Sequence, residues 1–284
     1  MPLTGIIGAM HEEVAHLIAD MQSQPGHACV RIGMRDYYLG TIEHQSCVVV
    51  LARLGKVAAA VTATTLIGKF GVDQIIFTGL AGGLAAQVKV GDVVIGTRLV
   101  QHDMDARPLF ARHEVPLLGT TAFEANATLC AELEHAATTF FKAGLQDRVP
   151  ADTLAGYGIA TPALHCGLIL SGDQFIGHPA QSDALRQCFP GALAVEMEGA
   201  AVAQVCHEHG VPQAVLRTIS DRADADAHGD FGSFLASIAS HYSDGILRAF
   251  FAARRERTGS TVGVAFSVAT GGPVSTAFAR QTDG

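Results

Sequence analysis

Short apolar runs alternate with helical patterns along most of the chain, and this alternation constrains the fold more than any other feature. Val93 to Val100 and Pro212 to Ile219 are apolar runs of strand length, typical of strands buried on both faces. Between such runs, apolar residues recur at helical spacing, as at Met10, Val14 and Leu17. Strands that alternate with helices predict an α/β domain, in which a mixed, largely parallel central sheet is flanked by helices.

The same patterns predict where each element lies. The expected strands cover residues 3–7, 28–33, 36–42, 46–52, 73–77, 93–100, 166–170, 193–195 and 212–219. The expected helices cover residues 10–21, 55–70, 124–143, 182–188, 199–209 and 231–251. We expect one domain over residues 1–257, with a loop-like insertion at about 144–160 and a C-terminal tail of different composition at 258–284.

Composition excludes several classes of protein. Hydrophobic residues make up 49% and charged residues 16% of the chain, enough apolar material for a large core. The net charge of -8, without a basic stripe, argues against nucleic-acid binding and favours a small-molecule substrate. No apolar run approaches about 18 residues, so no membrane span is expected. Six scattered cysteines and no signal peptide indicate a reduced, cytoplasmic protein.

Polar residues and glycines gather where the expected strands end. Four strand ends carry them, at 79–83, 171–173, 196–198 and 220–221. In open α/β sheets, ligands bind beside the carboxyl ends of the strands. We therefore expect these four segments to converge on one crevice.

The motifs taken singly leave alternatives open. The segment 79–83 could cradle a phosphate, form a tight turn, or let the backbone approach a neutral ligand; it matches neither a dinucleotide-binding nor a Walker pattern. No metal or cofactor is expected, because His207 and His209 are two apart on a helix and face different ways. Asp221 could be a turn former, and Glu13, beside Glu12, could belong to a solvated first turn.

Seven segments, taken together, resemble bacterial 5′-methylthioadenosine/S-adenosylhomocysteine nucleosidases, in the family's order and over about residues 3–251. They are GIIGAMHEEV (5–14), GKVAAA (55–60), TGLAGGL (78–84), VGDVV (90–94), SGDQFI (171–176), AVEMEGA (194–200) and RTISD (217–221). The resemblance implies a nucleoside phosphorylase-like domain, usually a homodimer. It implies hydrolysis of the N-ribosyl bond of both nucleosides, releasing adenine and the thioribose product.

The resemblance also assigns catalytic roles. Asp221 matches the general acid that protonates adenine at N7, with Ser220 beside it as a candidate positioner. Glu13 matches the base that activates water on the opposite face of the ribose, and Arg217 matches a residue near that base. Glu198 matches the carboxylate that accepts hydrogen bonds from the ribose hydroxyls.

Further matches concern binding. Met197 corresponds to the residue that lies against the sugar, and Glu196 to a second, more structural carboxylate. Phe175 corresponds to the aromatic ring stacked on adenine, while the backbone at Ile176 binds the base edge. The remaining expected lining residues are Leu54, Ala81, Gly82 and Phe231.

The chain departs from the family pattern at two places. Leu80 stands where many members have serine beside the water site. Residues 103–110 differ in a region that, in the family, helps form the 5′-substituent pocket, partly from the neighbouring subunit. Leu109, Phe110 and Pro116 are candidates for an apolar lining there.

Three other functions stay open. A phosphorylase of the same superfamily would need a phosphate site, yet the N-terminal loop offers Glu13, a carboxylate that repels phosphate. A hydrolase of a related nucleoside, such as aminodeoxyfutalosine, is a further alternative. A non-catalytic purine-binding protein is disfavoured, because Glu13, Glu198 and Asp221 occur together.

Overall fold

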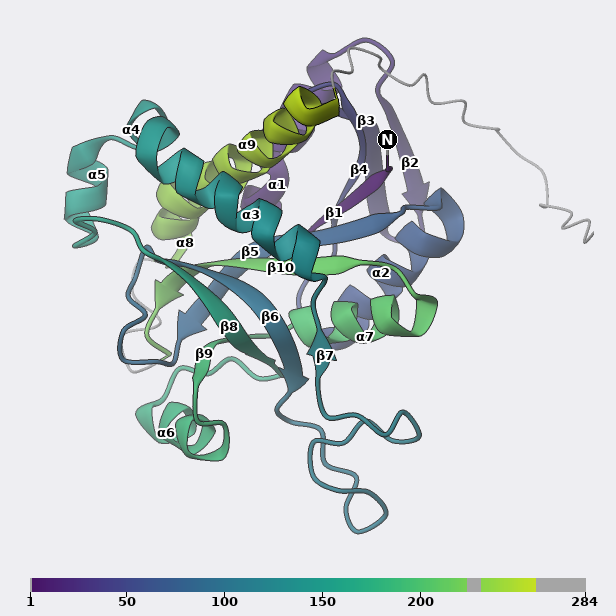
Figure 1. Ribbon diagram of the computed structural model, residues 1–284, viewed down its shortest axis with the longest axis vertical. Helices are drawn as coiled ribbons and strands as arrows, with labels where there is room; N and C mark the ends of the chain where they lie inside the picture. Colours follow the sequence, from purple (N-terminus) through teal and green to yellow (C-terminus); the bar gives the residue numbers. More distant parts are fainter. Residues whose placement is uncertain (1, 224–230, 259–284) are drawn as a thin grey trace, which may run out of the picture.

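A mixed sheet forms the centre of the computed structural model, which describes residues 2–223 and 231–258 (Figure 1). Its strands are β1 (Thr4–Gly8), β2 (Ala28–Ile32), β3 (Arg35–Ile42), β4 (Gln45–Leu51), β5 (Gln74–Gly83), β6 (Val93–Gln101), β7 (Phe123–Glu124), β8 (Leu164–Ser171), β9 (Ala192–Glu196) and β10 (Gln213–Asp221). The helical segments are α1 (His11–Ser23), α2 (Lys56–Phe70), α3 (Ala127–Thr139), η1 (Phe140–Gly144), α4 (Leu145–Arg148), α5 (Ala151–Gly156), α6 (Pro179–Cys188), α7 (Gly199–His209), α8 (Phe231–Phe234), η2 (Leu235–Ala239) and α9 (Ser240–Thr258), of which η1 and η2 are π-helical.

The strand pairing confirms the predicted fold class and adds a closed ring to it. The strand order is β10-β6-β8-β9-β5-β1-β4-β3-β2, and β10 also pairs with β5. Pairings among β5, β10, β6, β8 and β9 therefore form a ring, from which β1, β4, β3 and β2 extend as an open sheet. β1 is parallel to β4 and β5, β10 is parallel to β5, and β8 is parallel to β6 and β9.

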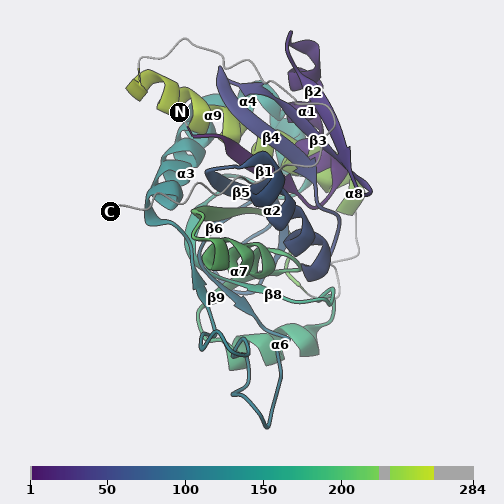
Figure 2. The same cartoon turned by 90° about the vertical axis from the view of Figure 1, so that its right-hand side faces the viewer.

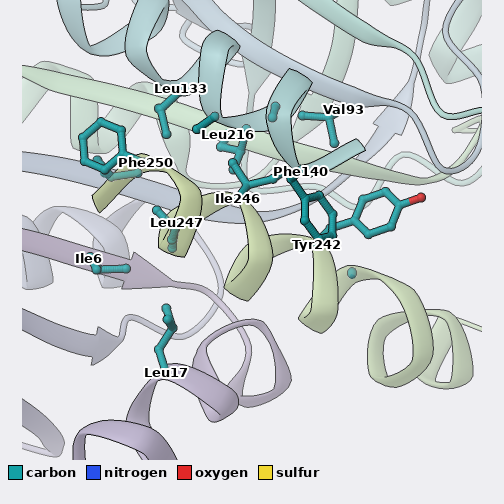
Figure 3. Close-up of a cluster of buried hydrophobic side chains, with 14 of the residues drawn as sticks. Ile6, Leu17, Val93, Leu133, Phe140, Leu216, Tyr242, Ile246, Leu247 and Phe250 are labelled. Carbon is teal, nitrogen blue, oxygen red and sulfur yellow. The ribbon is translucent and has the colours of Figure 1, made fainter. Parts of the chain in front are cut away.

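Helices cover both faces of the sheet because the central strands are apolar on both. Ile6 belongs to the core under α1, α3 and α9, whereas Ile7 belongs to the core under α2 and α7, as expected for successive strand residues. Figures 1 and 2 show these two helical layers. Figure 3 shows part of the first core, where Leu17, Leu133 and Phe250 approach the sheet. Burying each such side chain stabilises the fold by about 1.5–3 kcal/mol.

Two segments differ from the prediction. The loop-like character expected at about 144–160 is wrong for most of that segment, because α4 and α5 lie there and bury Leu145 and Leu154 in the core under α3 and α9. The glycine-rich segment after the expected strand 73–77 is itself strand: β5 continues to Gly83, where it pairs with β9 and β10. A tight turn there is therefore wrong as well.

The remaining expectations have mixed outcomes. The helix predicted at 124–143 begins at Ala127, since the Asn126 side chain caps it by accepting a hydrogen bond from the Leu129 N–H. The tail from residue 259 onward lies outside the described residues. Within the described ranges, no helix is both long and apolar enough to cross a membrane.

Candidate functional site

A cavity of about 210 Å³ opens at the carboxyl ends of β5, β9 and β10, beside the start of α1. We call it the strand-end cavity. It is lined by Ala9, Met10, Glu13, Leu54, Leu80, Ala81, Gly82, Gln174, Phe175, Ile176, Val195, Glu196, Met197, Glu198, Ser220 and Asp221. The four strand ends expected to converge all contribute to it or to the network behind it.

Most of the predicted site residues line this cavity. Of the set expected from the resemblance, Arg217 lies behind the cavity wall, and the Phe231 side chain is outside the described residues. The sequence analysis missed Ala9, Met10, Gln174 and Val195. All four lie inside the seven matching segments, so their position in those segments was the available signal.

Glu13, rather than Glu12, is the acidic residue of α1 that faces the cavity. Its side chain is 2% exposed, and one carboxylate oxygen accepts hydrogen bonds from the backbone N–H groups of Ala9 (2.6 Å) and Met10 (2.9 Å). The other oxygen accepts from the Leu80 N–H at 3.1 Å. Three donors, two from the segment after β1 and one from within β5, hold the carboxylate in one orientation.

Burial raises the pKa of Glu13 above its ordinary value of 4.5, and the nearby Arg217 guanidinium and the three N–H groups oppose that shift. The chain leaves room for this arrangement at Gly79. A Cβ there would lie 2.7 Å from a Glu13 carboxylate oxygen and 3.0 Å from the Arg217 guanidinium. A buried carboxylate with raised proton affinity is suited to accept a proton.

The raised pKa of Glu13 gives a prediction for stability. A group whose pKa is higher in the folded state stabilises folding below its unfolded pKa, and this contribution is lost as the pH rises through the folded value. Glu13→Gln removes the titration, so its melting temperature relative to wild type should increase as the pH rises above about 4.5. Thermal unfolding at about pH 4 to 8 measures this difference, and a flat difference would contradict it.

Arg217 is fully buried and holds the two carboxylates of the β9–α7 junction. Its guanidinium contacts Glu196 Oε2 at 2.5 Å and 3.2 Å, and lies 4.0 Å from Glu198 Oε2. It also stacks on the Phe77 ring, with the guanidinium carbon 4.0 Å from the ring centroid. This ion pair joins β10 to the end of β9.

Glu196 acts as a structural connection between these elements. Its carboxylate accepts hydrogen bonds from the Glu198 N–H (3.1 Å), the Gly199 N–H (2.8 Å and 3.0 Å) and the Ser171 hydroxyl. The carboxylate therefore caps the N-terminus of α7, where the helix dipole favours negative charge. All of these contacts agree with the structural role expected for Glu196.

Glu198 is turned away from Glu196, because β9 ends at Glu196 and α7 begins at Gly199. One of its oxygens accepts a hydrogen bond from the Gly55 N–H at 2.8 Å. Burial raises the pKa of Glu198, the negative charge of Glu196 raises it further, and Arg217 opposes both. The carboxylate faces the strand-end cavity with an oxygen available to accept from a hydroxyl group.

Asp221 lies at the last position of β10, on the wall of the cavity formed with Gly82. The Ser220 hydroxyl donates to Asp221 Oδ2 at 2.7 Å, and the Ala223 N–H donates to Oδ1 at 2.7 Å. A Cβ at Gly82 would lie 2.9 Å from Asp221 Oδ1, so glycine lets β5 approach this carboxylate. Ser220 therefore contacts Asp221 in the way a positioning residue would.

Apolar side chains form the rest of the wall. Phe175 and Leu54 are 47% and 59% exposed, and Met197 and Ile176 also line the cavity. In the described residues, no group of three or more His, Cys, Asp or Glu side chains is placed to hold a metal ion. The cavity thus joins apolar side chains to four carboxylates, of which Glu196 is paired with Arg217, a suitable arrangement for a ring with a polyhydroxylated substituent.

Comparisons with known proteins give a consistent result. The family profile described as "Phosphorylase superfamily" matches residues 4–252. A 5′-methylthioadenosine/S-adenosylhomocysteine nucleosidase of Shewanella putrefaciens (strain CN-32) is 37% identical over 237 residues, covering 84% of this chain and 93% of its own. The crystal structure of the nucleosidase of that name from Neisseria meningitidis, in complex with methylthio-immucillin-A, superposes with a TM-score of 0.76 at 33% identity, covering 89% and 100% of the two chains. The native futalosine hydrolase of Helicobacter pylori strain 26695 gives a TM-score of 0.73 at 32% identity, covering 88% and 97%.

Proposed function

The chain belongs to the phosphorylase superfamily and, within it, to the 5′-methylthioadenosine/S-adenosylhomocysteine nucleosidase family, and on this basis we propose that it hydrolyses the N-ribosyl bond of these two nucleosides. The products are adenine and the corresponding thioribose. The observation that carries the proposal is one cavity lined by Glu13, Glu198 and Asp221, each held by its own hydrogen-bond donors.

Asp221 is the general acid. Adenine is a poor leaving group as an anion, so protonation at N7 must accompany cleavage of the bond to the ribose. The hydroxyl of Ser220 and the N–H of Ala223 hold the two oxygens of Asp221 in fixed directions, which supports this role. The base itself lies against Phe175, with the backbone at Ile176 binding its edge.

Glu13 activates the water that attacks the opposite face of the ribose. The raised pKa of a buried carboxylate favours proton abstraction, and its three N–H contacts fix the direction of approach. An acid and a base on opposite faces, with water between them, is the arrangement of inverting glycosidases. Leu80 contributes a backbone N–H to Glu13 and only an apolar side chain to the cavity.

Glu198 holds the ribose hydroxyls, and Met197 lies against the ring. As the ribose becomes cationic on the way to the transition state, an anionic acceptor close to it binds more strongly. An interaction that strengthens in the transition state raises kcat rather than only lowering KM. Arg217, paired with Glu196, orients this carboxylate from behind.

The lining favours water over phosphate as the attacking group. Among the residues that the structure describes, no Lys or Arg side chain lines the strand-end cavity, and Arg217 is already paired with Glu196. We expect adenine release from methylthioadenosine to proceed at the same rate, within about twofold, with and without phosphate. Strict dependence on phosphate, measured in a phosphate-free assay, would identify a phosphorylase instead.

A second candidate is a hydrolase of a related nucleoside such as aminodeoxyfutalosine. The chain superposes on a futalosine hydrolase with a TM-score of 0.73, close to the 0.76 for a nucleosidase, and this similarity supports the second candidate function. Competition between methylthioadenosine and aminodeoxyfutalosine in one assay ranks the two substrates directly.

The enzyme is proposed to act as a cytoplasmic homodimer whose neighbouring subunit completes the 5′-substituent pocket. Apolar residues are exposed on α2, with Val57 at 75% and Val61 at 48%, and in the segment between β6 and β7, with Leu109 at 83%. Figure 1 shows that segment projecting from the body of the domain. Large apolar side chains exposed on a domain surface can mark interaction sites, and these residues are the ones we assign to the subunit interface. Leu109, Phe110 and Pro116 of one subunit would then line the other's pocket.

Placing a charge in this surface should separate the subunits. Val57→Glu is expected to yield a monomer whose KM for methylthioadenosine rises at least about tenfold, because an unpaired charge is costly to bury in an interface. Sedimentation velocity measures the first effect and steady-state kinetics the second. Lys69→Glu, exposed near the other end of α2, is the control. A dimeric, fully active Val57→Glu would argue against this interface.

A further inference from the structure

A second cavity, of about 280 Å³, lies between α1, the β2–β3 hairpin and the end of β4. Its charged lining residues are Arg31, Arg35, Asp36 and Arg53, with His11 at the start of α1. We call it the arginine groove, defined by these five residues. None of them takes part in the proposed chemistry at the N-ribosyl bond.

The charges in the arginine groove are unbalanced. Arg35 donates to the carbonyls of Ala52 (3.1 Å and 3.2 Å) and Ala58 (3.3 Å), and Arg53 donates to the carbonyl of Met34 at 2.7 Å. Carbonyl groups use up N–H donors but carry no net charge. Within the described part of the chain, Asp36 is the one carboxylate that lines the groove, and its nearest contact with Arg31 is long, at 3.8 Å. The groove therefore has an excess of positive charge that suits an anion.

The arginine groove lies beside the strand-end cavity, because residues adjacent in the chain line the two. Met10 and Leu54 line the strand-end cavity, and the residues bonded to them in the chain, His11 and Arg53, line the groove. The two cavities thus share a wall made of the α1 start and the β4–α2 connection.

In the proposed mechanism, the sugar end of the nucleoside lies near this wall. Glu13 accepts from the Met10 N–H, and Glu198 accepts from the Gly55 N–H next to Leu54. In the proposed mechanism these two carboxylates serve the ribose and its water, while Asp221 and Phe175 serve the base. A substituent on the 5′ carbon therefore leaves the strand-end cavity beside Met10 and Leu54, toward the groove.

The backbone at Arg53 adds a separate observation. Its φ of 71° lies in the left-handed region, which is uncommon for residues other than glycine, asparagine and aspartate. Such conformations persist where surrounding contacts hold them, and they concentrate at functional sites. Here the bond from the guanidinium to the Met34 carbonyl directs the Arg53 side chain across the groove, toward the β2–β3 hairpin.

We propose that the arginine groove binds the charged end of long 5′-substituents, so that the enzyme accepts adenine nucleosides whose 5′-thio chain ends in an α-amino acid, as in S-adenosylhomocysteine. The carboxylate pairs with Arg31 and Arg53, and Asp36 accepts from the ammonium group. The methyl group of methylthioadenosine is too short and carries no charge, so it gains nothing from the groove. This assignment rests on the proposed nucleosidase function and names a subsite for one class of its substrates.

Removing the charges of Arg31 and Arg53 should lower activity toward S-adenosylhomocysteine and leave activity toward methylthioadenosine unchanged. In Arg31→Gln/Arg53→Gln, kcat/KM for S-adenosylhomocysteine is expected to fall about 2- to 30-fold, the range for two solvent-exposed ion pairs. The value for methylthioadenosine should stay within about twofold. The wild-type advantage for the charged substrate should also shrink with added salt, which screens exposed charges. Arg98→Gln, an exposed arginine on β6 paired with Glu124, is the control for net charge.

A second pair of measurements tests whether the groove recognises the two charges of the amino-acid end of the substrate. Arg31→Lys/Arg53→Lys keeps both charges and should retain most of the activity toward S-adenosylhomocysteine. Asp36→Asn should lower activity toward S-adenosylhomocysteine but raise it toward a 5′-carboxyalkylthio-adenosine, which has the carboxylate and lacks the ammonium group. If Asp36→Asn lowers activity toward S-adenosylhomocysteine and raises it toward the carboxyalkylthio nucleoside, the groove must bind both charges of the amino acid.

The outcomes separate the subsite from the function it depends on. If wild-type enzyme releases no adenine from methylthioadenosine, the nucleosidase function itself is wrong. Suppose that methylthioadenosine is cleaved, but in Arg31→Gln/Arg53→Gln kcat/KM falls equally for both substrates or for neither. The nucleosidase function then stands, and the arginine groove is not a subsite. Melting temperatures of all variants within a few degrees of wild type would show that the changes reflect binding rather than folding.

Discussion

Asp221→Asn is expected to lower kcat for methylthioadenosine by about 10²–10⁴-fold, the range for loss of a general acid. Asparagine has nearly the same shape: its oxygen can accept from the Ala223 N–H and its NH2 group can donate to the Ser220 hydroxyl, so the local geometry should persist. It cannot deliver a proton to N7, and adenine would then have to leave as an anion. Adenine itself should bind with nearly unchanged affinity.

Two measurements check this prediction. Single-turnover adenine release gives the rate of bond cleavage, and calorimetry with free adenine gives the affinity. Ser220→Ala is the matched comparison: it removes one hydrogen bond to Asp221, worth about 0.5–1.5 kcal/mol, and should cost only about 2- to 13-fold. Unchanged turnover of Asp221→Asn would remove this residue from the acid role.

Arg217→Met is expected to reduce the free energy of unfolding by about 3–5 kcal/mol, the cost of breaking a buried ion pair by removing one partner. Arg217 is 0% exposed, and its loss leaves the Glu196 carboxylate buried without a cation. Glu198 and Glu13 lose the same positive charge, which opposes the rise in their pKa values. A loss of this size is a large fraction of the stability of a typical domain.

The pH dependence of this loss has a definite sign. Without Arg217 the pKa values of the nearby carboxyls rise further, and a group with a raised pKa destabilises the folded state as the pH rises through that value. The loss in the free energy of unfolding caused by Arg217→Met should therefore be largest at neutral pH and become smaller under acid conditions. Denaturant unfolding at several pH values measures it.

A double-mutant cycle locates the effect in the ion pair. The free energy of unfolding should fall less in Arg217→Met/Glu196→Gln than the sum of the decreases in the two single variants. The reason is that the double variant leaves no unpaired charge at the site of the ion pair. A deficit for Arg217→Met below about 1 kcal/mol, or one that does not change with pH, would show that the pair is not desolvated as its burial indicates.

Much of the fold was predictable because its signals are local. The period of two in the strands and of about 3.6 in the helices follows from backbone geometry, so the layers and nearly all elements could be placed from residue order. The prediction failed where local signals conflict with distant contacts. Residues 145–156 are helical because Leu145 and Leu154 reach a core built by α3 and α9, and residues 79–83 are strand because β9 and β10 pair with them.

The candidate site was predictable as a set of residues but not as a set of contacts. The strand-end rule and the seven matching segments identified most of the lining. Helical periodicity alone could not choose between Glu12 and Glu13, since adjacent helix residues differ by about 100° and either could face inward; only the resemblance selected Glu13. The resemblance likewise assigned different tasks to Glu196 and Glu198, but their hydrogen-bond partners depend on where β9 stops and α7 starts.

By itself the sequence determined the fold class, the family and the residue types available at the strand ends. The tertiary structure alone decided which carboxylate meets which donor. Leu80 donates to Glu13 from 67 positions away, and Gly55 donates to Glu198 from 143 positions away. It also decided that Arg31 and Arg53 line one groove beside the strand-end cavity. The physical reason is that periodicity is a property of neighbouring residues, whereas charge pairing and burial depend on segments that meet only in the folded chain.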